Sequence, residues 1–377
     1  MGAKHGSLAG MVVTMAFDLS LYTGKRVLVT GHSGFKGTWL CRMLILAGAD
    51  VYGYSLPLEN DGMTAFYDVA EVNDAITVTW GDIRDLASLQ SAFENANPDF
   101  VFHLAAQPLV IDGYREPVYT YETNVMGTVN ILECLRQHME QHPQKRLSFV
   151  NVTTDKVYEN KEWEWGYREN EPLDGYDPYS NSKSCSELVT HSYKNSFLDA
   201  MNVAVSTARA GNVIGGGDFA DNRIIPDCVR AAFKGKNIQV RNPHSMRPYQ
   251  HVLEPLYAYL MIGAKQYEDG SYAGYYNVGP DEVDCVTTGQ LVDLFCKFWG
   301  NGQSWTYEAM INNPHEANLL KLDCSKLKRT FGWHPVWRVS EAVEKTVEWA
   351  KCYQEKGNIP ALMNLQIEEF LASRIGL

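Results

Sequence analysis

The stretch KRVLVTGHSGFKG, residues 25–37, decides the fold. Its first half is an apolar run that predicts a buried strand, three glycines follow at once, and Thr38 to Ala47 reads as a helix that Gly48 ends. A strand, a glycine turn and a helix in this order indicate a dinucleotide-binding fold, because glycines let the backbone turn tightly and approach a pyrophosphate at the helix N-terminus. The spacing here is GxxGxxG, and a simple turn between strand and helix is the alternative.

The first half of the chain alternates strand and helix patterns. Further strand patterns lie at 50–54, 76–80, 100–104, 147–152 and 202–207, with helical patterns from Leu86 to before Pro98, from Val125 to about His138 and from Tyr179 to about Asn195. Uninterrupted alternation predicts an α/β fold with a doubly wound parallel sheet of the Rossmann type. Ligands bind such sheets at the carboxyl ends of the strands.

After residue 207 the pattern changes to a glycine-rich loop (209–218), shorter helices and strands, and a last amphipathic helix from about Ser340. At about 150 residues per domain, the 377 residues suggest two domains or one domain with a lobe. We expect a Rossmann domain of residues 21–211 plus about 248–280, and a smaller mixed α/β substrate lobe of about 212–247 plus 281–377. Residues 1–20 are interpreted as a leader or upstream extension, although the short apolar run from Leu8 to Phe17 makes a signal peptide conceivable.

The composition excludes several classes of protein. A net charge of −12 argues against general nucleic-acid or membrane-surface binding, which favour basic faces. No apolar run reaches the roughly 18 residues of a membrane span. The eight cysteines are scattered without a CxxC pair, which fits a reduced, cytoplasmic protein better than a disulfide framework or a zinc site, and no metal site is expected.

Residues at the strand ends predict the wall of a cofactor site. The acidic residue that usually contacts the ribose is absent after the second strand, where Ser55-Leu56-Pro57 stands, and no arginine is there for a 2′-phosphate, so this position does not decide between NAD and NADP. Asp82 could accept a hydrogen bond from an adenine amino group or be a turn residue. Lys36 could reach a cofactor phosphate or be solvated. The small Ala105 and Ala106 would let a cofactor lie close.

A second motif, DPYSNSK at 177–183, points to chemistry at a hydroxyl group. Tyr179 and Lys183 are four residues apart and share a helix face, with Asp177 suited to the helix cap and Pro178 to the first turn. A nearby ammonium favours the phenolate, so the pair could take a proton from a sugar or alcohol near neutral pH. The alternative is a solvated helix face.

A basic group, Arg241, His244 and Arg247, stands out on this acidic chain. A guanidinium fork matches phosphate oxygens, so the group could bind a diphosphate, with surface salt bridges as the alternative.

With these motifs in place, the chain resembles the extended short-chain dehydrogenase/reductase family from about Thr23 to at least Val347. The motifs that carry the resemblance are TGHSGFKG (30–37), HLAAQPLV (103–110), NVTTDKVYEN (151–160), GYDPYSNSK (175–183), ARAGNVIGGGDF (208–219), RNPHSMRPYQHVLEP (241–255) and LKLDCSKL (320–327). Thr154-Asp155-Lys156 resembles the group of 4,6-dehydratases that act on CDP-glucose, because related dTDP-glucose and GDP-mannose dehydratases carry Thr-Asp-Glu there.

The resemblance implies a redox-neutral dehydration with NAD: oxidation of the sugar at C4, loss of water across C5 and C6, and hydride return to C6. Tyr179 would take the C4 hydroxyl proton, and Lys183 would lower the Tyr179 pKa and hold the nicotinamide ribose. Thr154 would hydrogen-bond the C4 oxygen, and Asp155 would protonate the departing C6 hydroxyl. Lys156 would be a neutral base at C5 or a charged group that stabilises the enolate, and the first is preferred by analogy of position.

The resemblance also implies the binding residues. For NAD they are Gly31, His32, Gly34, Phe35, Lys36, Gly37, Asp82, Ile83, Leu104, Ala105, Ala106, Asn124, Thr153, Tyr179 and Lys183. For the nucleotide sugar they are Gln107, Thr154, Asn212, Arg223, Arg247 and Tyr249.

The family further implies a homodimer or homotetramer built through the helices at 125–138 and 179–195. The product would lead towards 3,6-dideoxysugars of bacterial surface polysaccharide, such as lipopolysaccharide O-antigen. The rivals are a dehydratase or epimerase acting on another nucleotide sugar, and a non-catalytic NAD-binding scaffold.

Overall fold

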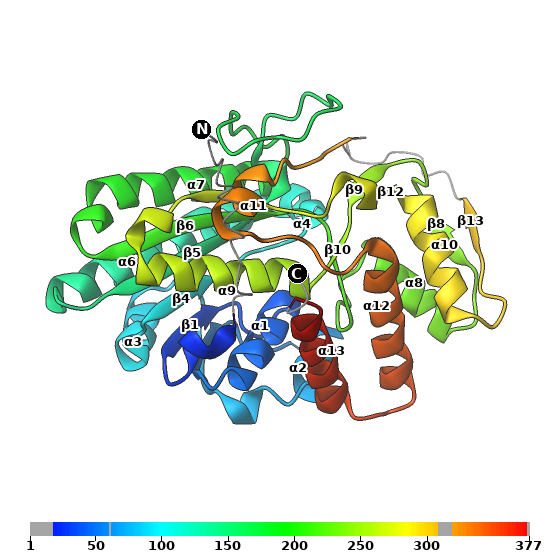
Figure 1. The fold of residues 1–377 in the computed structure, drawn as a ribbon, viewed down its shortest axis with the longest axis horizontal. Coiled ribbons are helices and arrows are strands. Elements are labelled where there is room, and N and C mark those ends of the chain that lie inside the picture. The colour runs from blue at the N-terminus through cyan, green and yellow to red at the C-terminus, as the bar shows by residue number, and fades with distance from the viewer. Residues whose placement is uncertain (1–17, 60–61, 308–318, 375–377) are drawn as a thin grey trace, which may run out of the picture.

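A parallel sheet of seven strands forms the centre of the computed structural model, which describes residues 18–59, 62–307 and 319–374 (Figure 1). Its strands are β1 (Arg26–Thr30), β2 (Asp50–Ser55), β3 (Thr77–Trp80), β4 (Phe100–His103), β5 (Leu147–Thr154), β6 (Val203–Ala210) and β11 (Tyr275–Val278). They lie in the order β11-β6-β5-β4-β1-β2-β3, and every neighbouring pair is parallel. The predicted doubly wound sheet is confirmed, and its strand order reverses between β1 and β4, where ligands bind in such folds.

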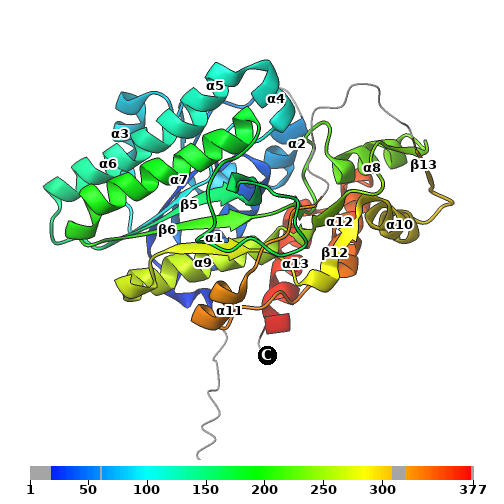
Figure 2. The ribbon, with the colours of Figure 1, turned by 90° about the horizontal axis from the view of Figure 1, so that it is seen from above.

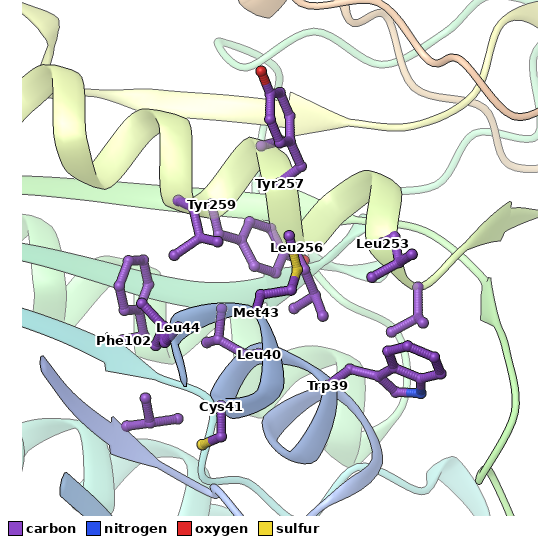
Figure 3. Close-up of a cluster of buried hydrophobic side chains, with 14 of the residues drawn as sticks. Trp39, Leu40, Cys41, Met43, Leu44, Phe102, Leu253, Leu256, Tyr257 and Tyr259 are labelled. Atoms are coloured by element: carbon purple, nitrogen blue, oxygen red, sulfur yellow. The ribbon is translucent and has the colours of Figure 1, made fainter. Parts of the chain in front are cut away.

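Helices cover both faces of this sheet (Figure 2). One face carries α1 (Phe35–Leu46), α9 (Leu253–Glu268) and α13 (Ile359–Arg374), and the other carries α3 (Leu86–Ala96), α6 (Gly127–Gln141) and α7 (Pro178–Ser196). The central strands β4, β5 and β6 are buried on both sides, which explains why they read as continuous apolar runs rather than alternating patterns. Figure 3 shows Leu40 and Met43 of α1 packed towards Leu256 and Tyr259 of α9.

The first half of the chain contains short helices besides those of the sheet layers. They are η1 (Leu19–Tyr22), α2 (Gly62–Val69), η2 (Asn73–Ala75), α4 (Val110–Arg115), α5 (Pro117–Tyr121), the π-helical turn η3 (Glu122–Met126), η4 (Asp155–Val157) and η5 (Leu198–Ala200). The helix predicted to start at Val125 therefore begins with a π turn and becomes α-helical at Gly127.

A smaller mixed lobe follows β6. It contains β7 (Val213–Ile214), α8 (Ile224–Phe233), β8 (Ile238–Val240), β9 (Met246–Pro248), β10 (Gln250–His251), β12 (Cys285–Thr287), α10 (Thr288–Trp299), β13 (Trp305–Tyr307) and α12 (Val339–Gln354), and the neighbouring short helices are η6 (Gly270–Tyr272), η7 (Glu282–Asp284) and α11 (Ser325–Phe331). Buried apolar side chains of α8, α10 and α12, such as Val229, Phe295 and Val343, form its own cluster.

The C-terminal helix α13 is an element that the sequence patterns did not predict. Met363 and Phe370 of α13 are buried in the same cluster as Trp39 of α1, and Arg42 donates a hydrogen bond to Asn364 at 2.8 Å. By number α13 falls in the predicted lobe, but it packs on the face of the sheet. The division of the chain at 211, 248 and 280 stays a prediction, and most of the leader predicted for 1–20 lies outside the described residues.

Across residues 18–59, 62–307 and 319–374, no helix is both long and apolar enough to cross a membrane. The same ranges contain no cluster of His, Cys, Asp and Glu that could hold a metal ion. All eight cysteines are free thiols.

Candidate active site

A cavity of about 1170 Å³ lies at the carboxyl edge of the sheet and extends to the lobe. Ligand pockets commonly measure about 300–1,000 Å³, so this one has room for more than one extended ligand. Its lining includes these predicted residues: Gly31, Gly34, Phe35, Lys36, Gly37, Asp82, Ile83, Leu104, Ala105, Ala106, Thr153, Thr154, Asp155, Lys156, Tyr179, Lys183, Asn212, Arg223, Arg247 and Tyr249. Three predicted site residues, His32, Gln107 and Asn124, lie behind the wall instead.

The glycine turn between β1 and α1 forms the floor of this cavity. Gly31 has φ +74°, and a β-carbon there would lie 2.7 Å from the amide nitrogen of Ala105. A β-carbon at Gly37 would lie 2.0 Å from the carbonyl oxygen of Gly31, so the turn closes only with glycine at both positions. Helix α1 starts after Gly34 without a side-chain cap, and its first-turn residues line the cavity. Uncapped amides at a helix N-terminus fit the pyrophosphate of a dinucleotide.

His32 does not face the cavity, although it was predicted to bind the cofactor. Its ring is buried between Tyr67 and Trp80, and its Nδ1 hydrogen-bonds the hydroxyl of Ser55 at 2.9 Å. Burial lowers the His32 pKa to about 4, so the ring is neutral at pH 7. The hydroxyl of Ser55 also accepts from the backbone N–H of Ser33 at 3.3 Å. His32 therefore braces the glycine turn from behind.

Asp82 lies at the cavity wall after β3, as predicted, but its carboxylate already has a partner. Arg84 donates to it through Nε and Nη2, with the shorter contact at 2.6 Å, and these bonds lower the Asp82 pKa. Ile83 packs against Gly127, where a β-carbon would lie 2.7 Å from an Ile83 methyl carbon. Gly127 therefore lets α6 approach this wall closely.

Gln107 was predicted to contact the sugar, but it forms a brace with Asn124. Asn124 accepts from the Gln107 backbone N–H at 2.8 Å and donates to its carbonyl at 3.1 Å and to the hydroxyl of Ser182 at 2.8 Å. The Gln107 side chain donates to Thr120 at 2.8 Å. The π turn η3 places Asn124 where its side chain joins the loop after β4 to α7. Gln107 and Asn124 therefore hold the cavity wall in shape and do not line it.

Thr154, Asp155 and Tyr179 meet at the end of β5. The hydroxyl of Thr154 donates to Oδ1 of Asp155 at 3.0 Å, and Tyr179 lines the same cavity, where the Thr154 hydroxyl acts to lower the pKa of its phenol. Asp155 is fully buried, and its Oδ2 has no hydrogen-bond partner among the described residues. Burial raises the Asp155 pKa against the opposing effect of Lys156, Thr154, Arg247 and Lys36, which favours a protonated carboxyl that can act as an acid.

The Tyr179 pKa differs from the expectation. Burial raises it to about 12, and the groups that oppose this rise are the Thr154 hydroxyl and the Arg223 guanidinium rather than the Lys183 ammonium. The prediction that Lys183 lowers the Tyr179 pKa is therefore wrong for the protein without ligands, because the loss of hydration of the phenolate outweighs the charges around it.

Lys183 lies one turn further along α7 and is also buried. Its Nζ donates to the carbonyl of Val152 at 3.3 Å, and burial lowers its pKa to about 8 while the carboxylate of Glu187 opposes this. Lys36 from the glycine turn reaches the same region, with its Nζ 5.9 Å from the ring centre of Tyr259. Burial and the nearby Arg223 and Lys183 lower the Lys36 pKa to about 8, so the side chain is still mostly protonated at pH 7 and suits a cofactor phosphate.

The lobe brings the predicted nucleotide-binding residues to the opposite side of the cavity. β7 and β10 pair in parallel, which places Asn212 beside Gln250, and the carbonyl of Asn212 accepts from the Gln250 backbone N–H at 3.1 Å. Arg247 is buried on β9. The guanidinium of Arg223 donates to Asp218 at 3.0 Å. The phenol of Tyr249 lies 3.3 Å from the hydroxyl of Thr288.

Sequence reasoning missed a buried ion pair directly behind the catalytic helix. Arg209 on β6 donates to both carboxylate oxygens of Glu187 on α7, at 2.9 Å through Nε. Thr153 also donates to Glu187, at 2.6 Å. The sequence contains a pattern that could have indicated Glu187: it follows Lys183 by four residues and so shares its helix face.

The Rossmann-type sheet, the glycine turn and the Tyr179–Lys183 pair in the cavity wall define the class as an extended short-chain dehydrogenase/reductase. Within it, the GDP-mannose 4,6-dehydratase family matches residues 28–346, and the chain belongs to this family.

Two dehydratases from Salmonella typhimurium strain LT2 are similar to this chain in sequence to different degrees. A CDP-glucose 4,6-dehydratase is 42% identical over 362 residues, which cover 94% of this chain and 99% of the relative. A dTDP-glucose 4,6-dehydratase is 25% identical over 346 residues, which cover 86% and 92%.

Solved structures agree with the fold. A UDP-glucose 4-epimerase from Thermotoga maritima with UDP-glucose has a TM-score of 0.74 at 22% identity, covering 87% of this chain and 99% of that one. A dTDP-glucose 4,6-dehydratase from Bacillus anthracis in complex with NAD has a TM-score of 0.71 at 20% identity, covering 88% and 98%.

Proposed function

We propose that the chain is a CDP-glucose 4,6-dehydratase, which converts CDP-D-glucose to CDP-4-keto-6-deoxy-D-glucose and water with NAD as its resident cofactor. The 42% identity to a relative of that name over nearly its whole length supports this activity. The residues present also fit a dinucleotide, because the glycine turn leaves an uncapped helix N-terminus facing a large cavity.

The observation that carries the proposal is that Thr154, Asp155 and Tyr179 line one cavity, with Thr154 hydrogen-bonded to Asp155. A 4,6-dehydration needs a group that removes the C4 hydroxyl proton and another that protonates the C6 hydroxyl as it leaves. Here the phenol and the buried carboxyl that suit these tasks line the same cavity, so a single hexose could reach both.

Tyr179 takes the proton of the C4 hydroxyl while Thr154 hydrogen-bonds the C4 oxygen. When bound, NAD supplies the hydride acceptor for C4, the donor for C6 and a positive charge beside the phenol. The Thr154 hydroxyl and the Arg223 guanidinium act against the burial that raises the Tyr179 pKa to about 12. The depressed Lys183 pKa of about 8 leaves this side chain mostly protonated at pH 7.

Asp155 protonates the leaving oxygen in the elimination. The 4-keto group acidifies C5, the C5–H electron pair becomes the second bond between C5 and C6, and the C6–O bond breaks as Asp155 gives its proton to form water. Burial raises the Asp155 pKa and so shifts this carboxyl towards the protonated form that the step needs. Lys156 supplies the group at C5, either as the neutral base or as a charged stabiliser of the enolate. Its charge acts on Asp155 and works to lower the pKa of that carboxyl.

Asn212, Arg223 and Arg247 bind the diphosphate and nucleoside from the lobe, because their side chains line the cavity opposite the glycine turn. Arginine suits this task, since its fork of donors matches phosphate oxygens. Tyr249, buried beside them, is proposed to face the base.

The test is incubation of the purified protein with CDP-, dTDP-, UDP- and GDP-glucose, followed by mass and NMR analysis of the products. We expect loss of one water from CDP-glucose without net NADH. An epimer of unchanged mass would favour the epimerase rival, and the absence of turnover with bound NAD would favour the scaffold. Equal turnover of CDP- and dTDP-glucose would overturn the nucleotide assignment.

We also propose that the protein acts in the cytoplasm as a homodimer or homotetramer, towards 3,6-dideoxysugars of surface polysaccharide. The apolar side chains of Met126 and Leu188 are half exposed next to α6 and on α7, which supports association through these helices. Light scattering of a Leu188→Lys variant tests the contact, and an unchanged mass would contradict it.

A further inference from the structure

Glu187 is a buried carboxylate one helical turn after Lys183. Both residues lie on α7, and their exposed fractions are 1% and 5%. Positions i and i+4 of a helix share a face, so the carboxylate and the ammonium point to the same side of α7, towards β5 and β6. Glu187 does not line the cavity. A carboxylate is seldom buried inside a protein without a partner or a function.

Contacts from two neighbouring strands fix this carboxylate. Arg209 of β6 donates through Nε to both of its oxygens at 2.9 Å, and Thr153 of β5 donates to Oε1 at 2.6 Å. Arg209 is held in turn, because its Nη1 donates to the phenol of Tyr158 at 2.7 Å, and that phenol donates to Asn277 at 2.6 Å. These contacts fix the Glu187 carboxylate and hold Thr153, the residue before Thr154, against the catalytic helix.

Lys183, in contrast, has little to hold its charge. Its Nζ makes one hydrogen bond, to the carbonyl of Val152, and burial works against the ammonium. The charge that favours the protonated form of Lys183 is the Glu187 carboxylate.

The other ionisable groups around the two residues come from four helices and strands and from the loop between η4 and α7. Lys36 on α1 and His103 on β4 lie near Lys183, and Tyr158, Glu169, Tyr275 and Lys326 surround the Glu187–Arg209 pair. His103 is neutral, since burial lowers its pKa to about 3. Lys36 is a second cation and favours loss of the Lys183 proton rather than its retention. This arrangement leaves Glu187 as the counter-charge.

We propose that Glu187 is a positioning residue for the Tyr179–Lys183 pair: its carboxylate, fixed by Arg209 and Thr153, is the counter-charge that keeps the Lys183 ammonium in place. The proposal rests on the function proposed for Tyr179 and Lys183. It predicts that the protonation of Lys183, and with it the upper pH limit of turnover, depends on a charge that never touches the substrate.

The test compares two variants across pH with CDP-glucose as substrate. Glu187→Gln alone would leave Arg209 buried without a counter-charge and could unfold the chain, so the informative variant is the double change Glu187→Gln/Arg209→Gln, which removes both charges. We expect its kcat/KM to decline at a pH lower by about one unit than in the parent. Glu187→Asp keeps the charge, so its upper limit stays at the parent's pH even where the rate falls.

A second buried ion pair provides the matched control. Arg374 donates to Glu254 at 2.5 Å, both side chains are as buried as those of Arg209 and Glu187, and neither lines the cavity. Glu254→Gln/Arg374→Gln is expected to lower Tm without moving the pH profile. A fall of kcat/KM by the same factor at every pH in the Glu187/Arg209 double variant, or an equal shift in the control, overturns the proposal.

Tyr179→Phe separates this inference from the proposed function. Turnover by Tyr179→Phe at the parent rate would overturn the role of the Tyr179–Lys183 pair and the Glu187 proposal with it. Loss of turnover in Tyr179→Phe, together with an unshifted profile in the double variant, would overturn the Glu187 proposal alone.

Discussion

The free oxygen of Asp155 lies against Gly211: a β-carbon at Gly211 would be 3.0 Å from Oδ2 and equally close to Cγ of Pro248. Space for the carboxyl that protonates the leaving hydroxyl therefore depends on the absence of one methyl group.

Gly211→Ala is predicted to slow elimination at least about tenfold, because a crowded carboxyl must turn away from the C6 oxygen. Oxidation at C4 should persist, so rapid-mixing absorbance should show transient NADH in the variant. Gly270→Ala is the control, since a β-carbon there meets no atom within 4 Å. Equal rates of elimination in Gly211→Ala and the parent would contradict the role of Asp155.

Lys156→Ala is predicted to oxidise C4 but to lose exchange at C5, since Lys156 is the group proposed to act on the C5 proton. The measurement is NMR detection of solvent deuterium incorporated at C5 of the sugar. Normal incorporation in Lys156→Ala would remove this residue from the mechanism.

Gly34→Ala and Gly37→Ala are predicted to fail in different ways. At Gly34 the nearest atom to a β-carbon is 3.4 Å away, so the fold should tolerate alanine while the methyl group intrudes on the site of the pyrophosphate. At Gly37 the contact is 2.0 Å, so stability itself should fall. Bound NAD after gel filtration and Tm from circular dichroism distinguish the two, and a Gly34→Ala protein that retains NAD would argue against the glycine-turn site.

Four buried histidines should make stability depend on pH. Burial lowers the pKa of His32 and His138 to about 4 and those of His103 and His251 to about 3, below the ordinary value of 6.5. The unfolded chain therefore binds more protons, and the free energy of unfolding should fall as pH drops from about 6.5 towards 4, by up to about 1.4 kcal/mol per pH unit for each histidine.

Urea unfolding at pH 7 and pH 5 measures this dependence. His251→Gln should reduce the slope by about a quarter, and His244→Gln, at an exposed position, is the control. A slope that is the same in both variants would contradict the prediction.

The strands and the outline of the site could be predicted from the sequence because they depend on local patterns. The apolar run before Gly31 gives β1, and the four-residue spacing of Tyr179 and Lys183 on α7 gives a shared face. Helix α13 could have been found the same way, since Ile359, Met363 and Ile367 recur at helical spacing.

Other features depend on tertiary contacts that no local pattern contains. His32 turns behind the glycine loop because Ser55, 23 residues away, offers a hydroxyl, and Gln107 turns towards Thr120 for the same reason. The Tyr179 pKa could not be predicted from its distance to Lys183, because the degree of burial decides its direction.

The number of residues in the π turn Glu122–Met126 sets how α5 is rotated relative to α6 in the active-site wall. An α-helix advances by about 100° per residue, so removing one residue from this turn would rotate α5 relative to α6 by that angle. Asn124 would then leave both Gln107 and Ser182. A deletion of one residue here therefore differs in kind from any substitution. It rotates every side chain on one side of the deletion about the helix axis, so that those side chains no longer face their present partners.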